Sequence, residues 1–200
     1  MKFKMNVPNA LTMVRIFCTP IIIVLFLVNI PYGIGYFCAL GIYALACLTD
    51  FLDGYIARKC NLITDFGKFM DQIADKFITT TAIILVLLAY PTTIGWLSVI
   101  LVLIVVLRDI LIGGVRMVAS KENVVISADI FGKVKSFFLD IASMVLLLWI
   151  GLSAVVSADW LNYVRIAGLS LMIVGVVLCV VSCVNYIFNA LKALNNKKID

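Results

Sequence analysis

The sequence has no histidine and little charge. Only 14% of its 200 residues are charged. Six cysteines are present, but none forms a Cys-x-x-Cys pair, and Cys179 and Cys183 share a helix face without further ligands. Two thiols are too few for a zinc site. These absences argue against zinc and favour cysteines that fill space inside apolar helices.

The shortage of charge is matched by a surplus of apolar residues. Hydrophobic residues make up 64% of the chain, and the mean hydropathy is +1.16. A soluble domain is about half apolar, so this surplus cannot all fit into one core and must face lipid. Several apolar runs approach or exceed the ~20 residues that cross a bilayer. We therefore predict an all-α integral membrane protein with a single transmembrane domain, residues 1–200.

Six transmembrane helices are expected, with breaks at Pro31 with Gly33 and at Pro91. The predicted spans are 9–28, 34–58, 64–89, 93–118, 129–150 and 161–193. Lys2 and Lys4 precede the first run as in a signal peptide, but no small-residue cleavage pattern follows it. The first helix is expected to be retained.

The basic residues follow membrane topology and form no single basic tract, which argues against nucleic-acid binding despite the net charge of +5. The connections around 29–33, 90–94 and 151–160 contain no Lys or Arg. By counting, 15 of the 16 basic residues lie on the other side, Arg165 being the exception. The positive-inside rule makes that side cytoplasmic, together with both termini. Tyr and Trp residues gather near the opposite interface, as expected of an aromatic belt.

Four aspartates stand out at the cytoplasmic level. Asp50 and Asp53 are three residues apart, and Asp71 and Asp75 are four apart, so each pair shares one helix face. The two helices are joined by a short connection and are expected to be antiparallel neighbours whose faces meet.

Four carboxylates that lose water in a membrane protein must be neutralised. Their hard oxygen ligands favour one or two ions of Mg²⁺ or Mn²⁺. The alternative is ion pairing with Arg58, Lys68 and Lys76 at the membrane interface.

Two glycines lie beside these aspartates. Gly54 follows Asp53, and Gly67 precedes Asp71 by four residues. A helical glycine costs about 1 kcal/mol relative to alanine, and it is useful where a ligand or another backbone must come close. Close packing of membrane helices would explain each glycine alone. With the carboxylates and Arg58 nearby, approach by a phosphate-bearing ligand is the better interpretation.

The stretch Asp50-x2-Asp53-Gly54-x2-Ala57-Arg58-x8-Gly67-x3-Asp71-x3-Asp75 resembles the signature of the CDP-alcohol phosphatidyltransferase family at all eight specified positions. The segment 8–15 also resembles that family's N-terminal element, and the pattern of six spans is similar. The resemblance covers nearly the whole chain. It implies a CDP-alcohol phosphatidyltransferase-like bundle, a multi-pass protein of a bacterial-type cell membrane with a cytoplasmic active site, and a homodimer.

The resemblance also implies a role for each matching residue. Two metal ions would be held by Asp50, Asp53, Asp71 and Asp75, and Asp75 would also be the general base. The donor, CDP-diacylglycerol, would be contacted by Asn9, Thr12, Gly54, Arg58 and Thr64. Gly67 would permit close approach. The donor's acyl chains would stay among the membrane lipids.

The second half of the chain should select the acceptor. Arg108 and Arg116 are eight residues apart and project to a similar side of one helix, and Lys133 and Lys135 open the next span. Charge is costly within an apolar span, and these cations would suit a phosphorylated acceptor.

The same residues resemble the phosphatidylglycerophosphate-forming branch of the family. The implied acceptor is sn-glycerol 3-phosphate, and the products are phosphatidylglycerophosphate and CMP. The sequence departs from that branch at Gln72, Asp109 and Ser136, where proline, glutamate and threonine are usual.

Other functions remain open at this point. The same chemistry with another acceptor is found in sister enzymes, namely cardiolipin synthase of the phosphatidyltransferase type and phosphatidylserine synthase. A divalent-cation transporter would also use intramembrane acids, but it predicts acids through the whole membrane thickness. The far half here holds few beyond Asp140 and Asp159. A helical scaffold without chemistry gives no reason for eight matching positions.

Overall fold

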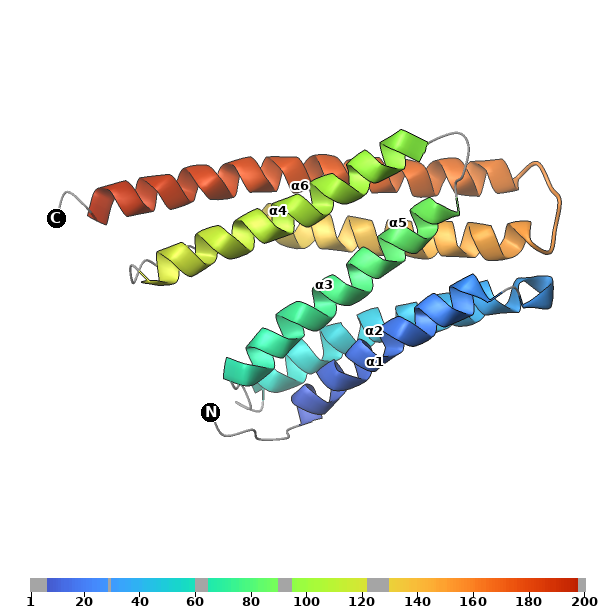
Figure 1. Cartoon of the computed structure of the whole chain (residues 1–200), viewed down its shortest axis with the longest axis horizontal. Coiled ribbons are helices and arrows are strands. Elements are labelled where there is room, and N and C mark those ends of the chain that lie inside the picture. The colour runs from blue at the N-terminus through green and yellow to red at the C-terminus, as the bar shows by residue number, and fades with distance from the viewer. Residues whose placement is uncertain (1–6, 29, 60–64, 90–94, 122–129, 198–200) are drawn as a thin grey trace. The chain divides into compact units, whose positions relative to one another are not determined.

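The computed structural model describes residues 7–28, 30–59, 65–89, 95–121 and 130–197. These residues form six α-helices and one short 3₁₀ helix, shown in Figure 1. The elements are α1 (Val7–Leu27), η1 (Pro31–Gly33), α2 (Ile34–Lys59), α3 (Asp65–Leu88), α4 (Gly95–Lys121), α5 (Ile130–Ser153) and α6 (Leu161–Lys197). Each α-helix coincides with one predicted span to within a few residues, which confirms the all-α, six-helix prediction.

Four of the described helices are long and apolar enough to cross a membrane, by length and composition. These candidate spans are Ala10–Leu27, Pro31–Phe51, Val134–Ser153 and Leu161–Ala193. Large apolar side chains such as Phe17, Leu45 and Phe188 are exposed on them. Outward-facing apolar surface of this kind is what a helix needs in contact with lipid.

The described part of the chain divides into two compact units. One comprises residues 1–89 and 143–168, and the other comprises residues 90–142 and 169–200. Helices α5 and α6 each contribute residues to both units. The predicted single domain, residues 1–200, stays a prediction.

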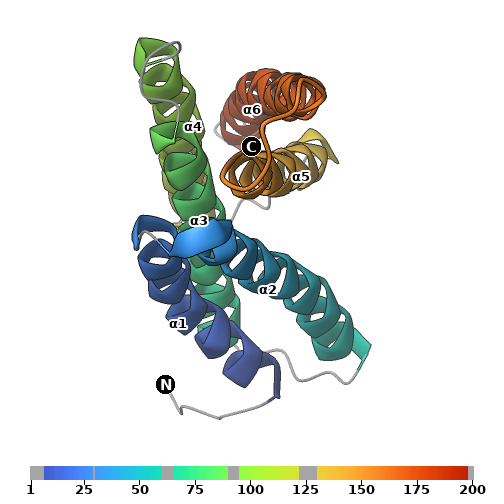
Figure 2. The same cartoon turned by 90° about the vertical axis from the view of Figure 1, so that its right-hand side faces the viewer.

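Within the first unit, α1 and α2 form a hairpin that turns at η1 (Figure 2). Tyr32 and Gly33 adopt left-handed backbone conformations there, with φ of 59° and 66°. Pro31 opens this turn, as the break at Pro31 with Gly33 predicted. Gly35 lets the two helices come together, because a Cβ atom at this position would collide with the backbone oxygen of Leu25.

Helix α1 is the centre of the α1–α3 group. It packs along both α2 and α3, whereas α2 and α3 contact each other only sparingly over the described residues. The expected meeting of the Asp50 and Asp71 faces is therefore made largely through α1, which places a third helix at the carboxylates.

Candidate active site

The buried face of α1 changes from polar to apolar along the helix. Thr12, Arg15 and Thr19 are buried at its N-terminal half, and Ile22 and Phe26 are buried further along. The spacing of three and four residues places all five side chains on one stripe. Arg15 is only 1% exposed, which is unusual for an arginine. A buried guanidinium must find partners of opposite charge.

Those partners come from α2 and α3. Buried Ala39, Tyr43 and Ala46 form a stripe on α2 that continues to Asp50. Buried Ala74 and Ile78 on α3 form a stripe that begins at Asp71. In each helix the carboxylate therefore lies at the end of the face that packs inward.

Arg15 bridges the two aspartates. Its Nη1 donates to Asp50 Oδ1, and its Nη2 donates to Asp71 Oδ1 at 3.1 Å. The side chains of Asp50 and Asp71 are 41% and 48% exposed, so each carboxylate also reaches the surface. The structure thus brings together two of the four predicted metal ligands around one positive charge.

The donor chemistry of this pair fits a hard divalent cation, because both carboxylates already direct an oxygen at a cationic group. Among the described residues, no group of three or more His, Cys, Asp or Glu side chains is arranged to hold a metal ion. Asp75 is exposed on α3, one turn beyond Asp71, and does not complete such a group with Asp50 and Asp71. The side chain of Asp53 lies outside the described part.

Several predicted donor-binding residues lie where side chains are not described. Asn9, Gly54 and Arg58 fall within α1 and α2, but only their backbone is described. Thr64 lies outside the described residues altogether. Thr12 is buried one turn before Arg15, and Gly67 is in α3, four residues before Asp71. The predicted contacts of these residues with CDP-diacylglycerol stay predictions.

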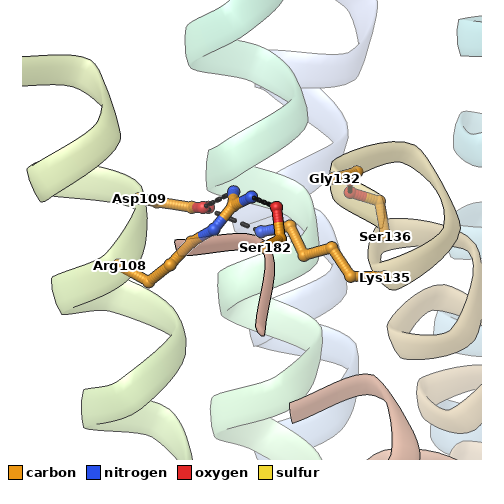
Figure 3. Close-up of polar contacts among 6 residues, drawn as sticks. All are labelled: Arg108, Asp109, Gly132, Lys135, Ser136 and Ser182. Carbon is orange, nitrogen blue, oxygen red and sulfur yellow. Dashed lines mark hydrogen bonds and ion pairs between the residues drawn. The ribbon is translucent and has the colours of Figure 1, made fainter. Parts of the chain in front are cut away.

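A second polar cluster occupies the other unit, where α4, α5 and α6 each contribute side chains (Figure 3). Asp109 accepts hydrogen bonds from Arg108 Nη1 and Lys135 Nζ, both at 2.8 Å. Arg108 Nη2 donates to Ser182 Oγ at 2.7 Å. Lys135 and Ser182 are buried, and the Arg108 side chain is 11% exposed. One carboxylate therefore holds two cations that would otherwise repel each other.

Gly132 provides room for this cluster. A Cβ atom at Gly132 would lie 3.3 Å from Arg108 Nη2 and 3.5 Å from Ser182 Oγ. A side chain at this position would be tight against the guanidinium, which would have to shift by a few tenths of an ångström. Ser136, one turn later, bonds back to the Gly132 carbonyl through its hydroxyl at 3.4 Å.

The four predicted acceptor residues do not all share this cluster. Arg108 and Lys135 are joined through Asp109. Arg116 is exposed on α4, and within the described part of the chain it makes no ion pair. Lys133 lies in α5, and its side chain is not described. The structure thus groups one arginine with one lysine.

A family model described as CDP-alcohol phosphatidyltransferase matches residues 5–181 of this chain. The chain belongs to the CDP-alcohol phosphatidyltransferase family. The match includes the helices that carry the four aspartates and those that carry the Arg108–Asp109–Lys135 cluster. Membership of a transferase family answers the transporter and scaffold alternatives in favour of an enzyme.

Three relatives of this phosphatidyltransferase share the name CDP-diacylglycerol–glycerol-3-phosphate 3-phosphatidyltransferase. The protein of Bacillus subtilis (strain 168) is 32% identical over 153 residues, 72% of this chain and 77% of the relative. The protein of Rickettsia bellii is 36% identical over 148 residues, covering 74% and 78%. The protein of Salmonella choleraesuis is 30% identical over 186 residues, covering 92% and 94%.

Sequence reasoning missed three residues of this phosphatidyltransferase. The sequence patterns place Arg15 among the cytoplasmic basic residues and in the segment 8–15, and Asp109 among the departures from the branch pattern, but they assign a role to neither residue. Ser182 is not among the predicted site residues. Arg15 and Asp109 lie within apolar helices, where charge is costly, and that cost was the available signal. Ser182 gave no signal, because serine is common at contacts between membrane helices.

Proposed function

We propose that this phosphatidyltransferase transfers the phosphatidyl group of CDP-diacylglycerol to sn-glycerol 3-phosphate, forming phosphatidylglycerophosphate and CMP. The observation that carries the proposal is the shared name of its relatives, which match up to 92% of the chain. The eight signature positions from Asp50 to Asp75 support the reaction type. The Arg108–Asp109–Lys135 cluster supports a charged acceptor.

The donor half of the reaction is assigned to the aspartates of α2 and α3. Asp50, Asp53, Asp71 and Asp75 would hold two Mg²⁺ or Mn²⁺ ions. Bound ions would neutralise the diphosphate while the bond from the phosphatidyl phosphorus to CMP breaks. Asn9, Thr12, Gly54, Arg58 and Thr64 would bind the remainder of the donor, and Gly67 would let it approach the helix.

Asp75 is the residue proposed to move the proton. Its side chain is exposed, so an acceptor hydroxyl can reach it. The carboxylate takes the hydroxyl proton as the hydroxyl oxygen forms its bond to phosphorus, and CMP leaves with the oxygen that linked it to that phosphorus. The proton passes from Asp75 to solvent before the next turnover.

Acceptor recognition is assigned to Arg108 and Lys135. An acceptor phosphate is doubly charged near neutral pH, and a guanidinium and an ammonium are its usual protein partners. Asp109 fixes both cations and cancels one of the two positive charges, which leaves a net attraction for an anion. Arg116 and Lys133 are proposed to add positive charge, since they lie in α4 and α5 as Arg108 and Lys135 do.

The proposal extends to the cellular setting. The enzyme would be a multi-pass protein of a bacterial-type cell membrane, with both termini and the active site on the cytoplasmic side, because the positive-inside rule assigns the side with 15 of the 16 basic residues to the cytoplasm. A homodimer is proposed from the family resemblance.

A panel of acceptors tests the proposed reaction. The purified enzyme in detergent is given CDP-diacylglycerol with glycerol 3-phosphate, serine or phosphatidylglycerol, each with Mg²⁺, with Mn²⁺ or with EDTA. We expect CMP release with glycerol 3-phosphate only, and only with a divalent ion. Release with serine or with phosphatidylglycerol would instead assign phosphatidylserine synthase or cardiolipin synthase activity. Full activity in EDTA would contradict the metal-assisted mechanism.

A further inference from the structure

The buried guanidinium of Arg15 has a place that membrane topology does not explain. It lies within the candidate span Ala10–Leu27 and is 1% exposed, so it is no surface charge. The polar residues Thr12 and Thr19 flank it on the same buried stripe. Thr19 Oγ1 donates to the Arg15 carbonyl oxygen at 3.2 Å, which ties this turn of α1 together. Helix α1 therefore directs a cation inward, at the turn that lies between Thr12 and Thr19.

At that level the guanidinium meets carboxylates from two separate helices. Nη1 bonds to Asp50 of α2 and Nη2 bonds to Asp71 of α3. One positive charge thus faces two negative charges, so the three groups together carry one net negative charge. Because Asp50 and Asp71 are about half exposed while Arg15 is not, the guanidinium covers the inner side of the carboxylates and leaves their outer side open.

A planar guanidinium group is suited to bonding two carboxylates from different helices. The donors of arginine are arranged in a fixed fork, so two of them can address two different acceptors at once. A lysine ammonium is a compact, strongly hydrated charge on a flexible stem and fixes less geometry. Asp50 and Asp71 carry like charges and bond to the same guanidinium, so the two carboxylates would repel each other without such a partner.

We propose that Arg15 is a positioning residue, which holds Asp50 and Asp71 in the arrangement that receives the metal ions and substitutes for their charge while the ions are absent. The inference rests on the metal-assisted transfer proposed above. The proposed role of Arg15 differs from that of a purely structural ion pair in one respect. A structural pair stabilises the protein equally with and without metal, whereas a substitute for the metal charge matters most when the metal is removed.

Thermal unfolding of the full-length enzyme in detergent separates the two roles. The Tm is measured with EDTA and with saturating Mn²⁺ for the wild type, Arg15→Gln and Arg15→Lys. Arg165→Gln is the matched control, because Arg165 lies over the Trp149 ring, with its guanidinium carbon 5.9 Å from the ring centroid. Gln removes the charge, and Lys keeps it with different geometry.

We expect Mn²⁺ to raise the Tm of Arg15→Gln by several degrees more than it raises the Tm of the wild type, because the metal-free form of the variant lacks the guanidinium that bonds to both carboxylates. Arg15→Lys should give an intermediate rise, and Arg165→Gln a rise equal to that of the wild type. If Arg15→Gln does not fold in EDTA but folds in Mn²⁺, the inference is supported in its strongest form.

Two results would overturn the inference, and they are distinguishable. If the wild type gains stability from Mn²⁺ but Arg15→Gln and Arg15→Lys gain the same amount, Arg15 is a structural ion pair and the proposed reaction is untouched. If the wild type gains nothing from Mn²⁺, the metal-assisted function fails together with the inference. Should Arg15→Gln fail to fold under both conditions, Arg15→Lys decides by the same comparison.

Discussion

Single charged residues determine how this phosphatidyltransferase is organised. Arg15, Arg108 and Lys135 are each largely buried, and each is bonded to an aspartate. Burying a charge without a partner is far more costly than burying an apolar side chain, so such residues fix the neighbours that they require. The ion pairs of Arg15 connect α1 with α2 and α3, and the ion pair of Asp109 with Lys135 connects α4 with α5.

Asp75 is the residue on which the proposed proton transfer depends. Replacement by Asn should lower kcat on the order of 10²–10⁴-fold, the usual contribution of a general base. Binding of CDP-diacylglycerol should be largely retained, since the amide nearly preserves the side chain's shape. Steady-state CMP release and a donor-binding assay measure the two effects. Asp159→Asn, an exposed aspartate outside the helices, is the control and should be fully active. An active Asp75→Asn enzyme would remove Asp75 from the base role.

Ser182 is expected to matter for the acceptor alone. The Ser182→Ala variant loses the 2.7 Å hydrogen bond to Arg108, which frees the guanidinium to turn away from its present position. Hydrogen bonds to charged groups contribute about 1.5–3 kcal/mol, so the KM for glycerol 3-phosphate should rise about tenfold or more. The KM for CDP-diacylglycerol should not change. Ser170→Ala, at an exposed position on the same helix, is the control. An equal loss of affinity for both substrates would indicate a general defect instead.

At the scale of helices, the inner stripes explain how the carboxylates converge. Helix α1 offers a face that continues from Thr12 to Phe26, and α2 and α3 each pack a row of small and aliphatic residues against it. Small side chains such as Ala39, Ala46 and Ala74 keep the helices close, as is usual in membranes, where lipid gives no hydrophobic drive for association. The aspartates then lie at the ends of rows whose positions are already set.

Gly35 tests this packing at one defined contact. In Gly35→Ala the new methyl group would collide with the Leu25 carbonyl oxygen, and a backbone atom cannot move aside as a side-chain end can. The α1–α2 hairpin should be destabilised by about 1–3 kcal/mol, as for other overpacked sites. Thermal unfolding in detergent measures this loss.

Gly41→Ala is the matched control for this contact. Gly41 lies on the same helix, and a Cβ atom there would meet nothing within 4 Å. Alanine should therefore leave the Tm unchanged or raise it, since it is the better helix former. Equal losses of Tm in Gly35→Ala and Gly41→Ala would show that the close approach at Leu25 is unimportant.

At the scale of the whole molecule, the proposed topology makes a direct prediction. Ser157 lies in the exposed connection between α5 and α6, and Lys192 is exposed near the end of α6. After replacement of the native cysteines, a membrane-impermeant maleimide should label Ser157→Cys in intact cells. Lys192→Cys should react only once the membrane is permeabilised. The reverse pattern would invert the topology and place the aspartates outside.

The fold class, the helices and the family can all be predicted from the amino-acid sequence. Apolar runs of membrane-crossing length, broken at Pro31 with Gly33 and at Pro91, predicted six helices whose ends agree closely with the structure. This worked because helix formation in a membrane is a local requirement, since every backbone group must be satisfied within its own segment. The spacing from Asp50 to Asp75 likewise predicts which aspartates share a helix face, because the periodicity of a helix sets which of its residues lie on one side.

Which charged side chains pair with each other depends on the packing of the helices. The sequence could not pair Arg15 with Asp50 and Asp71, nor Lys135 and Ser182 with the Arg108–Asp109 pair, because these partners are between 26 and 74 residues apart. Such contacts depend on how helices rotate and pack, which no local pattern records. The sequence therefore indicates only that Arg15 belongs to the cytoplasmic basic residues, whereas packing buries it and bonds it to two carboxylates. The physical reason is that periodicity fixes the face of a residue within its own helix, whereas its partner is fixed only when two faces come together.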